Sequence, residues 1–198
     1  ELERVSDQPK LKGLRMLIHD RSDPDFAMSE AHVRGVSRLS SHGLTYDLLL
    51  KPPHLPAAIR LIDRLPNQKF CVDHIAKPDI RHGVLEPWRS LLMDMAKRPN
   101  VFCKISSVIT QADWNRWSYS EIEPYLDVAL EAFGPDRIMV GSDWPVSTCA
   151  ADYATALGLF RTWSARLSET ERAALLGGNC IRFYGIEEQS GLADGISF

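Results

Sequence analysis

The sequence predicts an α/β protein built from repeated strand–helix units around a parallel sheet. Apolar, strand-like runs occur at residues 14–18, 45–50, 70–74, 101–105 and 137–141, and successive runs begin 25 to 36 residues apart. The runs are apolar throughout rather than alternating, which is typical of parallel strands that are buried on both faces. A spacing of about 30 residues is also that of a (β/α)8 barrel, which spends about 250 residues on eight units.

Helical patterns lie between these runs. Their apolar residues recur every three or four positions, so that each helix buries one stripe. Gly43 is a stop signal for the first helix, and Ser168 with Glu171 fits a capping box that opens a short last helix ending near Gly177 and Gly178. The other expected helices cover residues 31–42, 54–65, 87–97, 120–133 and 151–167.

The whole chain, residues 1–198, is expected to form one domain, because no linker or low-complexity tract interrupts the pattern. Right-handed crossovers leave two architectures, an open doubly wound sheet and a closed barrel, and the strand pattern does not separate them. The nucleotide-binding version of the open sheet is disfavoured, because neither GxGxxG nor GxxxxGK[ST] occurs.

The composition of the chain argues against several classes of protein. The 198 residues are 44% hydrophobic and 25% charged, with a net charge of -3, as in ordinary soluble proteins. This charge offers no basic face to nucleic acid, and no apolar run approaches the roughly 20 residues that cross a bilayer. The four cysteines are far apart, which favours reduced thiols, and the first residues lack a signal-peptide pattern. We therefore expect a cytoplasmic protein that binds neither nucleic acid nor membrane.

Polar side chains accompany every strand-like run. Burying such ions singly would cost several kcal/mol each, so we expect them to converge on one another, on solvent or on a ligand. A structural salt bridge is the alternative for Lys104 and Asp47. The side chains concerned are Arg15, Tyr46, Asp47, Asp73, His74, Lys104 and Asp143.

Asp143 and His74 are the main candidates for chemistry. An apolar strand runs into Asp143, and Gly141 and Pro145 force a turn that leaves its carboxylate at the mouth of the fold. The alternative is that Asp143 caps the next helix. His74 ends the run at residues 70–74, and as a neutral imidazole it could bind a metal or a substrate oxygen, or serve as a structural hydrogen-bonding group.

Further residues are candidates for substrate binding. Arg15, Lys77 and Lys104 could pair with a substrate carboxylate, although structural salt bridges are the alternative. Trp144, next to Asp143, is a binding candidate together with Arg15, Tyr46 and Lys104. Trp114 and Trp117, in the loop after Lys104, could wall a pocket for a ring.

Five segments together resemble the amidohydrolase-related (amidohydrolase 2) family of sugar lactonases and 2-pyrone-4,6-dicarboxylate lactonases. They occur in the family's order, and the resemblance extends through residues 178–185. The segments are residues 12–15 (Lys-Gly-Leu-Arg), 43–49, 70–78 (containing Asp-His-Ile-Ala-Lys-Pro), 100–106 and 133–145 (containing Gly-Ser-Asp-Trp-Pro). The resemblance implies a metal-dependent-hydrolase-like TIM barrel whose strands four to eight carry Arg15, Tyr46, His74, Lys104 and Asp143.

The sequence also departs from this family. The family's first strand, with its His-x-His pair, has no counterpart here, and strands two and three are also missing. Met16 is another departure, because many relatives have a polar residue after the arginine. Either the chain is part of a longer enzyme, or it is a shortened, non-catalytic relative that acts by binding or by forming homo-oligomers through its exposed barrel edges.

The resemblance implies a hydrolase that opens a sugar or pyrone lactone to a hydroxy acid. Asp143 would take a proton from the attacking water and return it to the leaving alkoxide, while His74 and Arg15 or Lys104 would stabilise the oxyanion. Zinc or a similar divalent metal would polarise carbonyl or water in the intact enzyme. We expect this chain alone to bind metal poorly, because His74 and Asp143 supply two ligands where catalytic zinc takes three. A decarboxylase of the same superfamily is the remaining alternative.

Overall fold

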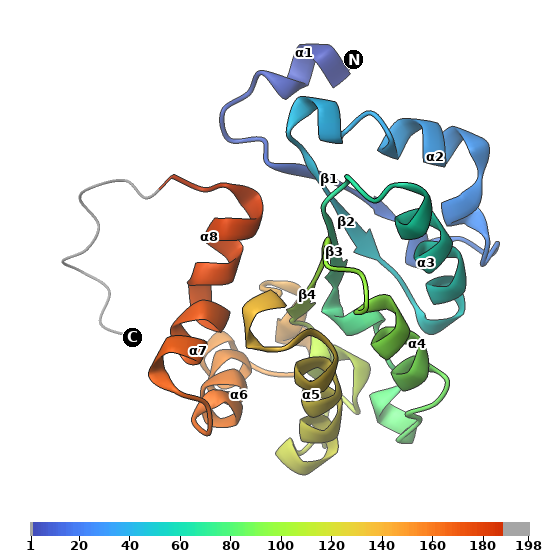
Figure 1. Ribbon diagram of the computed structural model, residues 1–198. Coiled ribbons are helices and arrows are strands. Elements are labelled where there is room, and N and C mark those ends of the chain that lie inside the picture. The colour runs from blue at the N-terminus through green and yellow to red at the C-terminus, as the bar shows by residue number, and fades with distance from the viewer. Residues whose placement is uncertain (1, 188–198) are drawn as a thin grey trace.

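The chain forms a five-stranded, fully parallel sheet with helices between the strands (Figure 1). The computed structural model describes residues 2–187. The strand order β1-β2-β3-β4-β5 follows the sequence, so each strand pairs with the next one along the chain. The α/β prediction is therefore confirmed. The strands are β1 Gly13–Leu17, β2 Thr45–Leu49, β3 Phe70–Asp73, β4 Val101–Ile105 and β5 Ile138–Val140.

The helices follow the predicted pattern with small shifts in their ends. Gly43 has a left-handed φ of 67° and stops the short turn that follows α2, as predicted. None of the helices in the described part of the chain has both the length and the apolar surface that crossing a membrane requires. The helices are α1 Leu2–Ser6, α2 Glu30–Val36, α3 Leu55–Arg64, α4 Trp88–Met95, α5 Tyr119–Phe133, α6 Tyr153–Ser164, α7 Glu169–Ala173 and α8 Asn179–Tyr184.

The expected helix end near Gly177 and Gly178 is wrong. Ser168 caps α7 through the backbone N–H of Glu171, as predicted. The helical path then continues through a π-helical turn, Ala174–Gly178, directly into α8. Gly178 has a φ of -54°, which continues a helix, whereas Gly185, with a φ of 59°, supplies the left-handed residue that ends it.

Different helices cover the two faces of the sheet. Leu48, Val72 and Cys103 on adjacent strands are fully buried in the main core, on the side of the sheet where Figure 1 shows α2, α3 and α4. The opposite face, which we call the inner face, carries a smaller apolar cluster that includes Cys71 and Phe183. Phe183 belongs to α8, so α8 covers part of the inner face. The buried positions of Cys71 and Cys103 agree with the prediction for thiols on strands.

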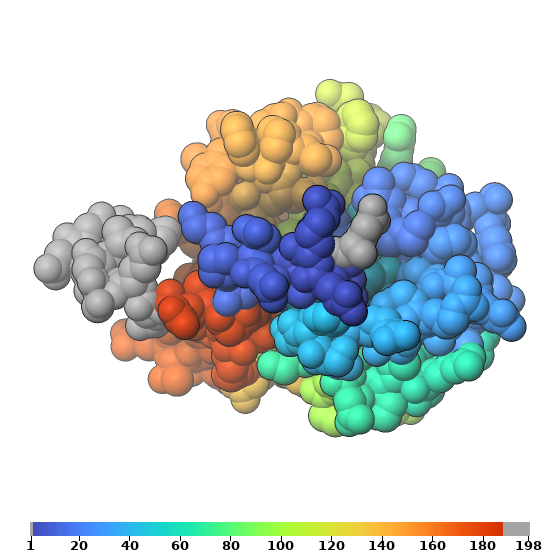
Figure 2. Space-filling view, turned by 90° about the horizontal axis from the view of Figure 1, so that it is seen from above, coloured from blue at the N-terminus to red at the C-terminus, as the bar shows by residue number. Residues whose placement is uncertain are grey.

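Strands β1 and β5 are the edges of the sheet, and each has one neighbouring strand. On β1, Leu14 is 36% and Leu17 50% exposed. Beside this edge, Leu2 of α1 lines an apolar groove of about 490 Å³ together with Met16 and Val36. Figure 2 shows the dark blue N-terminal segment between the light blue region of α2 and the red C-terminal helices. The edge at β1 is therefore only partly covered.

Candidate active site

The register of the strands gathers charged side chains on the inner face. Arg15 lies opposite Asp47, and Leu49 lies opposite Asp73. Alternate residues of a strand point to opposite faces, so Asp47 and Asp73 share the inner face. Lys104 of β4 reaches both carboxylates. The expected convergence is confirmed for four of the seven side chains, which are Arg15, Asp47, Asp73 and Lys104.

A network of ion pairs joins these side chains. Asp73 accepts a hydrogen bond from Nη1 of Arg15 at 2.9 Å and lies 2.8 Å from Nζ of Lys104. Lys104 also donates to Asp47 at 2.6 Å. The hydroxyl of Tyr184, on α8, donates to the same Asp47 carboxylate at 2.8 Å. The salt bridge considered for Lys104 and Asp47 is thus present, and the charges on this face compensate one another.

This compensation keeps the central ions charged. Burial opposes ionisation of Asp73, whose side chain is 1% exposed, but Lys104 and Arg15 outweigh it and lower the pKa of the carboxyl group. Burial likewise disfavours the charged form of Lys104. The carboxylates of Asp73 and Asp47 act against this effect, and the pKa of the ammonium group is raised. Asp73 and Lys104 are therefore a charged pair at neutral pH.

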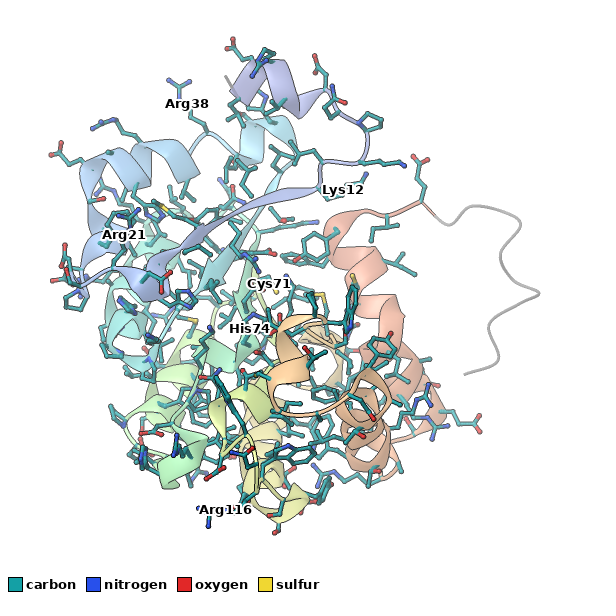
Figure 3. All side chains as sticks on the ribbon, turned by 180° about the vertical axis from the view of Figure 1, so that it is seen from behind. Lys12, Arg21, Arg38, Cys71, His74 and Arg116 are labelled. Atoms are coloured by element: carbon teal, nitrogen blue, oxygen red, sulfur yellow. The ribbon has the colours of Figure 1, made fainter. Side chains whose placement is uncertain are left out.

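His74 and Asp143 face each other beyond the ends of β3 and β5. Nε2 of His74 lies 3.7 Å from Oδ1 of Asp143, and Nδ1 of His74 is hydrogen-bonded to Oγ of Ser106 at 2.7 Å. Burial lowers the pKa of His74 against the opposing effect of Asp143, so the imidazole is neutral at pH 7. Figure 3 shows His74 beside the orange segment that follows β5. Ser106 fixes the ring, and the gap at Nε2 is one that a water or an ion can bridge.

The backbone that presents these groups is strained. Residues 74–77 have φ values of 56°, 45°, 57° and 49°, and Asp143 has 55°. The left-handed region costs non-glycine residues about 1–2 kcal/mol each, so neighbouring groups must hold the turn. Trp88 is one such group, because its indole N–H donates to the carbonyl of Ile75 at 2.6 Å. Strain of this kind concentrates at functional sites.

Ala76→Gly is expected to cost far less stability than Ala129→Gly. Both alanines are fully buried, but Ala129 lies inside α5, whereas Ala76 has a left-handed backbone. Glycine relieves strain at residue 76 and removes a strong helix former at residue 129. The free energies of unfolding of the two variants, measured in urea, should differ by about 2 kcal/mol. Equal losses would show that the turn is not strained.

The structure places Tyr46 away from this cluster. Its hydroxyl lies 2.7 Å from Nε2 of His32, on α2. Tyr46 directly precedes Asp47, and adjacent residues of a strand point to opposite faces, so the tyrosine faces the helices while the aspartate faces inward. We therefore do not keep Tyr46 among the substrate-binding residues, and Asp47 takes the inner position on β2.

The predicted tryptophans lie in the loops at the strand ends. Trp144 is 63% exposed next to Asp143, so its ring is available to a ligand. Trp117 donates its indole N–H to the carbonyl of Ala150 at 3.0 Å, and Trp114 donates to that of Thr110 at 2.9 Å. The indole N–H groups of Trp114 and Trp117 therefore form hydrogen bonds within the loops.

The sequence did not single out two residues that support the site, Ser106 and Tyr184. Ser106 ends the segment 100–106 that carries the family resemblance, and its position directly after a strand is the signal that could have found it. Tyr184 contacts Asp47 across 137 residues of sequence, and no local pattern reveals such a contact.

His74 and Asp143 are the side chains of this site that could hold a metal ion. A neutral imidazole and a carboxylate are both zinc ligands, and their facing atoms are close enough for one shared ion. Across residues 2–187, no group of three or more His, Cys, Asp or Glu side chains is arranged to hold a metal. The two donors therefore fit part of a zinc site.

Known proteins resemble this chain in both sequence and fold. A family model described as Amidohydrolase matches residues 1–186. L-fucono-1,5-lactonase of Burkholderia multivorans is 38% identical over 190 residues, which cover 90% of this chain and 64% of that protein. L-fucono-1,5-lactonase of Burkholderia ambifaria is 32% identical over 196 residues, which cover 96% of this chain and 67% of that protein.

A solved structure shows that the fold of this chain is also similar to that of a known protein. The crystal structure of an amidohydrolase from Burkholderia multivorans with bound Zn matches with a TM-score of 0.89 and 37% identity, over 93% of this chain and 69% of that one. The lactonase of Burkholderia multivorans is covered over 64% of its length, so the chain spans less than two thirds of that relative. The five parallel strands are the incomplete TIM barrel that the sequence predicts.

Proposed function

This chain belongs to the amidohydrolase family, and on that premise we propose that it carries the catalytic acid–base residue of a lactonase, Asp143. The reaction would open the ring of a sugar lactone to a hydroxy acid. The observation that carries the proposal is the position of Asp143 opposite a neutral His74 that Ser106 holds in place. The substrate class comes from the two Burkholderia relatives, which are L-fucono-1,5-lactonases.

Asp143 would act first on water and then on the leaving oxygen. Its carboxylate takes a proton from water while the water oxygen bonds to the lactone carbonyl carbon. When the tetrahedral intermediate collapses, the ring C–O bond breaks, and Asp143 returns the proton to the alkoxide. One water is consumed, and one hydroxy acid is formed.

Arg15 is the cation best suited to stabilise the oxyanion. It bonds to Asp73 through one nitrogen, and its side chain is 47% exposed, so further N–H groups of the guanidinium remain available. Lys104, in contrast, is held between Asp47 and Asp73. A divalent ion held by His74 and Asp143, with further ligands from outside this chain, would polarise the lactone carbonyl or the water.

Hydrolysis of L-fucono-1,5-lactone tests the proposal. Acid release is followed at constant pH for the 198-residue chain, and also for the longer product if the reading frame extends upstream of residue 1. We expect release above the spontaneous rate from at least one of these forms. If neither form hydrolyses the lactone, the lactonase proposal fails and a non-catalytic role replaces it.

A further inference from the structure

We infer that the mouth of the site contains a subsite for the carboxylate of the hydroxy-acid product, formed by Lys77 with Lys51. The inference rests on the proposed lactonase activity for the identity of its ligand. Hydrolysis converts an uncharged lactone into an anion, so an enzyme of this kind must accommodate a negative charge that its substrate lacks.

The two lysines come from the ends of adjacent strands. Lys51 follows β2, and Lys77 ends the left-handed turn after β3. Strands β2 and β3 are parallel neighbours. Their carboxyl ends therefore meet at one edge of the sheet, the same edge at which His74 lies.

Lys77 differs from the other two cations that the sequence offers for a ligand carboxylate. Arg15 is paired with Asp73, and Lys104 is held by Asp47 and Asp73. Lys77 makes no ion pair with a carboxylate within residues 2–187, although the charge of Asp143 acts on it. Of the three cations, Lys77 is thus the one without a carboxylate partner in the described part of the chain.

The two ammonium groups repel each other. Burial lowers the pKa of Lys77, and Lys51 lowers it further, against the opposite effects of Asp143 and Asp20. A carboxylate bound between the two lysines would relieve their repulsion and accept charge-assisted hydrogen bonds.

The position of Lys77 also suits the reaction. The carboxylate carbon of the product is the former lactone carbonyl carbon, which lies near Asp143 when water attacks. Once Asp143 has returned its proton and the new carboxylic acid has lost its own proton to solvent, two carboxylates stand close together and repel each other. Lys77 offers the new carboxylate a cationic partner, so the product can leave Asp143 before it leaves the protein.

Binding of L-fuconate to the 198-residue chain tests the subsite by calorimetry. L-fucitol is the matched ligand, because an alcohol replaces the carboxylate on the same carbon chain. We expect L-fucitol to bind at least about tenfold more weakly. Lys77→Asn should weaken L-fuconate binding about tenfold, because asparagine removes the charge and tolerates the left-handed φ of 49°. Raising the salt concentration should weaken L-fuconate binding and leave L-fucitol unaffected.

Two further variants serve as checks. Lys51→Met, at a residue with an extended backbone, should weaken L-fuconate binding without strain on the turn. Lys97→Met should leave it unchanged, because Lys97 follows α4 and precedes β4, at the opposite end of the sheet. Circular dichroism confirms that each variant is folded.

The subsite is overturned if Lys77→Asn and Lys51→Met both bind L-fuconate as tightly as the unmodified chain. It is also overturned if L-fucitol binds equally well, or if millimolar L-fuconate does not bind. Lactone hydrolysis is a separate measurement. A protein that binds L-fuconate through Lys77 but hydrolyses no lactone keeps the subsite and loses the proposed function.

Discussion

Asp143→Asn is expected to lower kcat/KM for L-fucono-1,5-lactone by about 1000-fold in whichever form of the protein hydrolyses it. The amide has nearly the shape of the carboxylate but cannot take a proton from water. Asparagine also tolerates the left-handed φ of 55° at this residue, so the turn should keep its conformation. The measurement is the initial rate of acid release, together with the midpoint of urea denaturation.

Asp136→Asn is the matched control for this variant. Asp136 is an exposed aspartate in the turn Pro135–Arg137, just before β5, whereas Asp143 lies just after that strand. The control should keep full activity. If Asp143→Asn also kept activity within a few-fold of the unmodified protein, Asp143 could not be the general base.

Asp73→Asn is expected to lower the free energy of unfolding at pH 7 by about 3–5 kcal/mol. The side chain of Asp73 is 1% exposed and lies between Arg15 and Lys104. An uncharged amide leaves Lys104 with one carboxylate partner instead of two in a buried setting. Asp63→Asn is the control, because Asp63 pairs with Arg98 at 2.8 Å but is 51% exposed. Loss of that surface pair should cost about 1 kcal/mol or less.

The pH dependence of stability gives a second test of Asp73. The folded protein lowers the pKa of this carboxyl group below its unfolded value of about 3.9. Asp73 therefore adds stability above that value, and the contribution disappears as the pH falls through the folded pKa. The difference in unfolding free energy between the unmodified protein and Asp73→Asn should shrink below about pH 4. A difference that grows on acidification would contradict the ion network.

The fold was largely predictable because its signals are local. Continuous apolar runs mark strands buried on both faces, and Gly43 and Ser168 mark helix ends through their own backbone and side-chain chemistry. The end of the last helix was missed because a glycine does not require a left-handed φ. Gly178 keeps a helical backbone, and the chain continues into α8.

The site was predictable only in part. Its geometry depends on which face of the sheet each side chain points to, and on contacts between residues that are far apart in the sequence. Tyr46 and Asp47 are adjacent in the sequence, and only the register shows which of them faces inward. The turn at residues 74–77 contains no glycine, so its sequence does not indicate that the backbone is left-handed. It exists because buried neighbours such as Trp88 hold it.

The sequential strand order has a consequence for how the protein folds. Each strand pairs with the next one in the chain, so the sheet can grow by closing one strand–helix loop at a time, at a small entropic cost per step. The contact between Tyr184 and Asp47 is different, because it spans 137 residues. It can form only after the intervening strands are in place. We therefore expect α8 to dock late in folding, and to be the first element to detach when the protein begins to unfold.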